Sequence, residues 1–169
     1  FSGKIMADPH SKPGLTLVST PIGNLGDISL RAIEALRSAD KILCEDTRVS
    51  KKLLEKHGIV SRLSNYHEHN AKLVRPKIID GLKAGAKIVL ISDAGTPSIS
   101  DPGYQLVKAC IKNDLKISTV PGPTALIAAL TISGLPTDSF YFGGFLPNKR
   151  NARRKKLLEK KELETTLIF

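Results

Sequence analysis

The chain contains 169 residues, enough for one ordinary domain and part of a second. Hydrophobic residues make up 41% and charged residues 25%, the balance of a soluble globular protein, and no apolar run approaches the roughly 20 residues of a membrane span. The formal net charge of +10 favours a polyanionic partner, while Cys44 and Cys110 lack metal-site spacing and predict two buried thiols in a reducing cytoplasm.

The N-terminal residues 1–14 are polar, begin with Phe and lack the apolar core of a signal peptide. We expect them to form a flexible or artificially added tail. Five runs rich in apolar and β-branched residues follow along the chain. They predict strands over residues 15–20, 41–45, 61–67, 87–92 and 116–120.

The segments between these runs have the apolar spacing of amphipathic helices. Asp27 is placed to cap the first helix, Gly58 to end the second, and Pro76 to start or kink the third. We expect helices over residues 28–37, 50–57, a segment ending near 85, 104–113 and 123–133. Regular strand–helix alternation predicts an α/β fold, a parallel five-stranded sheet with helices on both faces.

The alternation breaks near residue 138. Residues 134–138 are typical of a loop, and residues 140–145 concentrate aromatic side chains that are scarce elsewhere. A basic helix and a last strand over residues 165–169 follow. We therefore expect an N-terminal domain over residues 15–138 and the start of a truncated second α/β domain over residues 139–169.

The basic segment Lys149–Glu162 holds eight Lys or Arg against two Glu. Such a concentration of positive charge favours nucleic acid first and an acidic membrane second. A solvated helix face is the alternative.

Three loops at predicted strand ends are rich in glycine, proline and small polar residues. In a parallel sheet they emerge at one edge and can line one cleft, although a rigid connection is the plainer interpretation. None contains GxGxxG or GxxxxGK[ST], and their few cations favour a small neutral or zwitterionic ligand over a triphosphate. The loops are Ser19–Asp27, Ser92–Gly103 and Val120–Ala125.

Five motifs together resemble one family, the bacterial 16S ribosomal RNA 2′-O-ribose methyltransferases that act on a cytidine. That family belongs to the tetrapyrrole-methylase fold of S-adenosylmethionine-dependent enzymes, and the likeness runs from about Leu15 to Phe169. The motifs are Pro21–Asp27, Glu45–Arg48, Tyr66–Asn70, Ser92–Gly103 and Val120–Pro123.

The resemblance implies that S-adenosylmethionine is held in a cleft between two domains. Many tetrapyrrole enzymes have an acidic residue where this chain has Thr96, so nearby Asp93 is expected to be the substitute acceptor. The other residues implied to bind the donor are Pro21, Ala94, Gly95, Thr96, Ile99, Thr124 and Ala125. It also implies a cytoplasmic homodimer acting on 16S ribosomal RNA within the small ribosomal subunit, with no membrane partner.

A ribose hydroxyl is a weak acid, so a nearby base would assist methyl transfer. Asp46 and Asp101 are the candidate bases, and Arg48 is a candidate anchor for phosphate or substrate. Alternatively, Asp46 only orients Arg48, and Asp101 only caps a turn. The candidate RNA contacts in the basic segment are Lys149, Arg150, Arg153 and Arg154.

His67 and His69 alternate along a predicted extended segment, which would direct them to opposite sides. No third ligand is evident, so we expect substrate contact or a structural role rather than a metal site.

Two other functions stay open at this point. One is methylation of a small molecule such as a tetrapyrrole by the same fold, and the other is non-catalytic RNA binding. We also expect residues 1–169 alone to be inactive, because the second domain should close the donor site.

Overall fold

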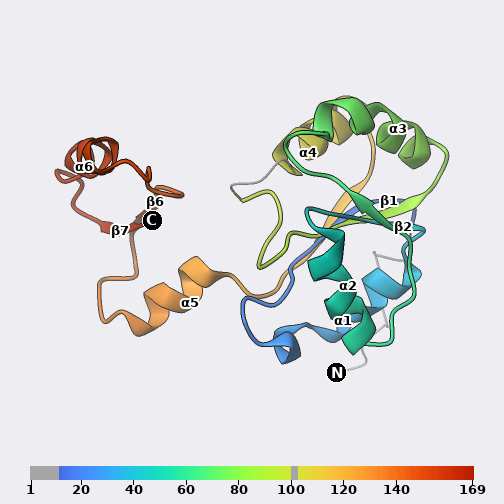
Figure 1. Ribbon diagram of the computed structural model, residues 1–169, viewed down its shortest axis with the longest axis horizontal. Coiled ribbons are helices and arrows are strands. Elements are labelled where there is room, and N and C mark those ends of the chain that lie inside the picture. The colour runs from blue at the N-terminus through green and yellow to red at the C-terminus, as the bar shows by residue number, and fades with distance from the viewer. Residues whose placement is uncertain (1–11, 100–102) are drawn as a thin grey trace, which may run out of the picture. The chain divides into compact units, whose positions relative to one another are not determined.

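The computed structural model describes residues 12–99 and 103–169 (Figure 1). These residues divide into two compact units, one up to Thr124 and the other Ala125–Phe169, which are described separately below. The domain limit at residue 138 stays a prediction. No helix of the described residues is both long and apolar enough to cross a membrane.

The first unit is a parallel sheet of five strands in the order β3-β2-β4-β1-β5. Its strands are β1 (Gly14–Val18), β2 (Lys41–Cys44), β3 (Leu63–Asn65), β4 (Lys87–Leu90) and β5 (Ile117–Val120). Its helices are the short 3-10 helix η2 (Leu25–Asp27), α1 (Leu30–Ser38), α2 (Thr47–Lys56), α3 (Ala71–Lys83) and α4 (Gly103–Lys112).

Helices cover both faces of this sheet, as the sequence predicts (Figure 1). Successive strand residues point to opposite faces. Leu43 therefore packs with α3 and α4, whereas its neighbour Ile42 packs with α1 and α2. The buried residues thus form two apolar clusters, one with α3 and α4 and the other with α1 and α2. The same alternation places Leu90 in the first cluster and Val89 in the second. Both cysteines are buried and free, one in each cluster.

Two helix starts differ from prediction for reasons of capping. The Ser29 side chain accepts a hydrogen bond from the Ala32 amide and caps α1, so the assignment of that cap to Asp27 is wrong; Asp27 ends η2. Helix α2 begins three residues early because the Asp46 carboxylate accepts a bond from the Arg48 amide. Pro76 lies inside α3.

The second unit holds α5 (Ala125–Ile132), β6 (Phe140–Phe142), α6 (Arg150–Leu158) and β7 (Thr166–Ile168). Strands β6 and β7 pair in parallel, with Tyr141 opposite Leu167. The Lys156 ammonium donates to the carbonyls of Gly143 at 2.8 Å and Phe145 at 3.0 Å, which fixes α6 against the preceding loop. Little of this unit is buried; in α5 only Leu130 is.

Candidate functional site

Strand order brings the three predicted loops to neighbouring places. Strands β4, β1 and β5 are adjacent in the sheet, and the loops leave from their carboxyl ends. We call Ser19–Asp27, Ser92–Ile99 and Pro121–Thr124, the described parts of these loops in the first unit, the glycine–proline loops.

A two-bond bridge joins the first two glycine–proline loops. The Thr20 amide donates to the Gly95 carbonyl at 3.0 Å, and the Gly95 amide donates to the Thr20 carbonyl at 3.1 Å. The buried Thr20 hydroxyl also donates to the Ser92 carbonyl at 3.1 Å. Gly95 has a φ of +78°, and a Cβ there would lie 3.3 Å from Ile22 Cγ2, so this bridge favours glycine.

Thr96 connects all three loops. Its hydroxyl lies 3.1 Å from the Ser19 hydroxyl and donates to the Pro123 carbonyl at 3.4 Å. Gly122 lies so close to the first loop that an added Cβ would meet Ser19 Cβ at 2.9 Å. The loops therefore form one hydrogen-bonded assembly, consistent with the predicted common edge.

The predicted donor residues differ in exposure. Pro21 and Gly95 are buried, Thr96 and Thr124 are partly buried, and Asp93, Ala94 and Ile99 are exposed. Ala125 is the first residue of α5 and belongs to the second unit. The loops contain Asp27 and Asp93 but no Lys or Arg, so their fixed charge suits a cationic or zwitterionic ligand.

Asp46 is engaged on three sides. Its amide donates to Asp93 Oδ1 at 3.1 Å, and its carboxylate accepts from the Arg48 amide at 2.8 Å and from Arg48 Nη2 at 2.6 Å. The hydrogen bonds from Arg48 lower the pKa of Asp46 to about 2. A carboxylate with so low a pKa is a weak proton acceptor, which favours the cap and Arg48 orientation over general-base work. Asp101, the other candidate base, lies outside the described residues.

Arg48 is held by Asp46 yet reaches solvent, with 88% of its side chain exposed. Lys149 is the N-cap residue of α6, and Arg150, Arg153 and Arg154 are exposed on that helix. These five cations are accessible, as contact with a polyanion requires, and the last four belong to the second unit.

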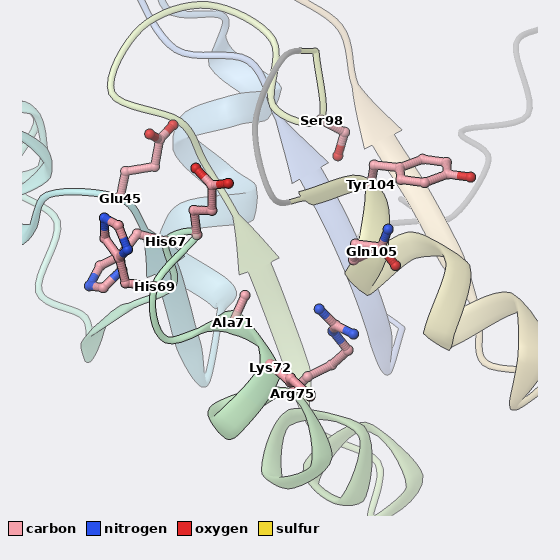
Figure 2. Close-up of a pocket in the computed structure, with 10 residues that line it drawn as sticks. Glu45, His67, His69, Ala71, Lys72, Arg75, Ser98, Tyr104 and Gln105 are labelled. Atoms are coloured by element: carbon pink, nitrogen blue, oxygen red, sulfur yellow. The ribbon is translucent and has the colours of Figure 1, made fainter.

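A cavity of about 730 Å³ opens beside the loops that follow β2, β3 and β4 (Figure 2). We call it the charged pocket, because acidic, basic and imidazole side chains line it together. Its lining residues are Glu45, His67, Glu68, His69, Ala71, Lys72, Arg75, Ser98, Tyr104 and Gln105. The sequence interpretation missed this pocket, although three of the recognised motifs supply five of its lining residues.

His67 and His69 both line this pocket with ring centroids 5.9 Å apart, so the expectation that they point to opposite sides is wrong. The reason is local: the chain turns at residues 68–70, and Asn70 Oδ1 accepts a bond from the His67 amide at 2.9 Å. Within the described residues, no three His, Cys, Asp or Glu side chains gather closely enough to hold a metal ion.

Comparisons with solved structures support the fold. A uroporphyrin-III-C-methyltransferase from Thermus thermophilus superposes with a TM-score of 0.60 at 21% identity, covering 87% of this chain and 74% of that one. A diphthine synthase superposes with a TM-score of 0.61 at 19% identity, covering 76% of this chain and 51% of that one.

Relatives named "Ribosomal RNA small subunit methyltransferase I" are much closer in sequence. The protein from Mesorhizobium japonicum is 54% identical over 94% of this chain and 54% of its own length. The Thermotoga maritima protein is 46% identical over 92% of this chain and 70% of its own length. The chain spans about half the length of several curated relatives it matches.

The family of Tetrapyrrole (Corrin/Porphyrin) Methylases matches residues 14–169, nearly the whole chain. The five-stranded parallel sheet and the solved structures of the same fold agree with that match. The chain therefore belongs to the tetrapyrrole (corrin/porphyrin) methylase family, alongside relatives named ribosomal RNA small subunit methyltransferase I.

Proposed function

We propose that the protein methylates 16S ribosomal RNA at the 2′-hydroxyl of a cytidine, with S-adenosylmethionine as the methyl donor. The observation that carries this proposal is the 46–54% identity, along almost the whole chain, to relatives named for small-subunit ribosomal RNA methylation. The exposed cations of α6 and the net charge of +10 support an RNA substrate.

The glycine–proline loops fit the donor chemically. S-adenosylmethionine, when bound, supplies a methyl group on a positively charged sulfur, and its amino acid end is zwitterionic. Loops that carry carboxylates and no Lys or Arg match that charge. Pro21, Gly95, Thr96 and Thr124 would form the ordered floor of the site, and exposed Asp93, Ala94 and Ile99 would face the ligand. We assign Ala125 to the same site from the family resemblance.

Much of the rate enhancement would come from positioning, since methyl transfer needs the acceptor oxygen in line with the methyl group. The loops begin at strand ends and are hydrogen-bonded to one another, so they are held in place for that task.

The group that removes the ribose proton stays a prediction, with Asp46 and Asp101 as the two candidates. Asp46→Asn and Asp101→Asn decide it: loss of the true base should reduce kcat by about 10² or more with unchanged donor affinity.

The experiment uses the full-length protein, S-adenosylmethionine and small ribosomal subunits from a strain that lacks the gene. We expect calorimetry to detect donor binding, and mass spectrometry of digested 16S RNA to detect one new 2′-O-methylcytidine. Donor binding without RNA methylation would favour a small-molecule acceptor, and RNA binding without donor binding would favour a non-catalytic protein. Residues 1–169 alone should give no turnover.

Two further properties belong to this proposal. We propose a homodimer in the cytoplasm, from the family resemblance, and size-exclusion chromatography with light scattering tests the dimer. A monomer that methylates at the full rate would contradict it.

A further inference from the structure

The charged pocket lies at the same sheet edge as the glycine–proline loops but on its other half. Glu45 directly follows β2, His67–His69 follow β3, and Ser98 belongs to the segment after β4. Strands β3, β2 and β4 are adjacent, just as β4, β1 and β5 are. The loop after β4 is thus shared by the two halves.

We propose that the charged pocket binds the acceptor nucleotide of the substrate RNA, with its phosphate on Lys72 and Arg75 and its base on the acidic side. The inference rests on the proposed function, because it assumes that the transferred methyl group goes to a nucleotide. The volume of the charged pocket, about 730 Å³, lies within the range of small-ligand sites.

The basic side of the pocket comes from α3. Lys72 and Arg75 are three residues apart and so lie on one face of the helix. Arg75 Nε donates to the hydroxyl of buried Tyr66 at 3.3 Å, which orients the guanidinium. Figure 2 shows the Arg75 side chain reaching from α3 toward the space that Gln105 of α4 also faces. A guanidinium held in this way suits a phosphate, which accepts paired N–H donors.

The acidic side lies across the pocket from Arg75, where Glu45 and the two histidines are drawn in Figure 2. Carboxylates accept hydrogen bonds from exocyclic amino groups such as N4 of cytosine. A base that is read on its Watson–Crick edge must be unstacked, as in single-stranded RNA. Glu45 and Glu68 therefore favour an amino-bearing base, cytosine rather than uracil.

Two local features indicate that the pocket is built for a ligand. His67 Nδ1 is buried and has no hydrogen-bond partner among residues 12–99 and 103–169, an uncommon state for a buried polar atom. Ser98 has a φ of +72°, a left-handed conformation that costs a non-glycine residue energy and is concentrated at functional sites. Both residues line the pocket.

The shared loop explains how acceptor and donor can meet. Gly95 is bridged to Thr20 on the donor half, and Ser98, three residues later, lines the pocket. Asp93 Oδ1 accepts the Asp46 amide bond at 3.1 Å and so ties the loop after β2 to the loop after β4. A ribose between these sites would sit beside both, as methyl transfer requires.

The test measures two affinities of the full-length protein in parallel. One is for a short cytidine-containing single-stranded RNA, by fluorescence anisotropy, and the other is for S-adenosylmethionine, by calorimetry. Lys72→Glu reverses a charge in the pocket, and Lys77→Glu makes the same change on an exposed residue of α3 outside it. We expect Lys72→Glu to weaken RNA binding about tenfold more than Lys77→Glu, the size of one charge-assisted hydrogen bond, with unchanged donor affinity.

Equal RNA affinities for the two variants would overturn the proposal. A different outcome separates this proposal from the proposed function. If Lys72→Glu weakens RNA binding and Lys77→Glu does not, but the wild-type protein binds no S-adenosylmethionine, the proposed function is refuted and the nucleotide site is retained.

A separate experiment tests the preference of the pocket for cytosine over uracil. Titration with cytidine 5′-monophosphate and uridine 5′-monophosphate should show tighter binding of the cytidine nucleotide, and Glu68→Gln should reduce the difference. Equal affinity of the wild-type protein for both nucleotides would refute the assignment of the acidic side. Binding of the RNA but of neither mononucleotide would refute a pocket that recognises the nucleotide itself.

Discussion

The two halves of the sheet edge use opposite kinds of chemistry. The glycine–proline loops after β1, β4 and β5 act through backbone and small hydroxyl groups, joined by bonds such as Thr20–Gly95 and Thr96–Pro123. The charged pocket after β2, β3 and β4 is lined by long ionisable side chains. Both stand on the same two-sided core.

The difference teaches how one fold can separate two tasks. Where loops touch each other closely, a ligand meets a preset backbone, and an added methyl group is costly. Where long side chains surround a cavity, specificity can change with single residues while the backbone stays in place. The half made of backbone suits a donor common to many methylases, and the half made of side chains suits the acceptor that distinguishes them.

The largest effect should come from Gly122→Ala. The new Cβ would lie 2.9 Å from Ser19 Cβ, so the loops after β1 and β5 must separate. Overpacking of this kind costs about 1–3 kcal/mol, and we expect donor affinity in calorimetry to fall tenfold or more, with RNA affinity retained.

Gly81→Ala is the matched control for that change. Its Cβ would meet Ile88 Cδ1 at 3.8 Å, an ordinary contact, and α3 should gain about 0.5–1 kcal/mol in its free energy of unfolding. Donor binding as tight in Gly122→Ala as in Gly81→Ala would show that the close approach of the loops does not matter for the donor.

A smaller effect, on the pocket half alone, should follow Tyr66→Phe. The ring stays in the core, but Arg75 Nε loses the hydroxyl that it donates to. We expect RNA affinity in the anisotropy assay to fall roughly fivefold, as for one lost hydrogen bond, with donor affinity unchanged. Tyr141→Phe, the same change in the second unit, should leave both affinities as they are. A fall in donor affinity would mean that the two halves are not separable.

Asp46→Asn should produce a pH-dependent change in stability. Asn preserves the α2 cap but loses the ion pair with Arg48. Because the pKa of Asp46 is lowered to about 2, the stabilising contribution of the carboxylate is present above its ordinary pKa of 3.8 and is lost as pH falls toward 2. The free energy of unfolding from urea titrations should differ between the proteins at pH 5 and converge only as the pH approaches 2. A difference that is constant with pH would contradict the assignment.

The smallest effect is expected at the thiols. Burial raises the pKa of Cys110 to about 11 and also raises the pKa of Cys44, so neither forms a reactive thiolate at neutral pH. Iodoacetamide should label both only as fast as the protein unfolds, as followed by mass spectrometry of their peptides. The two thiols lie in the buried clusters on opposite faces of the sheet, one in each. Neither donor nor RNA should therefore accelerate their labelling. Selective acceleration of one would show that ligand binding loosens that face.

The fold was predictable because its strands are runs of apolar and β-branched residues, and successive residues of each strand point to opposite buried faces of the sheet. Residues 87–92 predict β4 with only its last two residues outside the strand. The errors lie at element ends, where one side chain decides: Ser29 rather than Asp27 caps α1, and Asp46 starts α2 early. Residues 61–67 form a strand only over Leu63–Asn65, since the turn that places His67 begins there.

The site was predictable in part for a related reason. Glycine and proline mark unusual backbone at the residues where it occurs, so the loops containing Gly95 and Gly122 could be found in the sequence. The charged pocket has no such local mark. Lys72 and Ser98 line the same pocket only because β3, β2 and β4 are adjacent, which is a property of strand order rather than of any one segment.

The bridge between Thr20 and Gly95 has a thermodynamic consequence. Both amides are already bonded, so folding itself removes the torsional freedom of these residues. A ligand that meets such a loop orders little chain on arrival, and more of its contact energy appears as affinity. The amide protons of Thr20 and Gly95 should therefore exchange with solvent deuterium as slowly before the donor binds as after it.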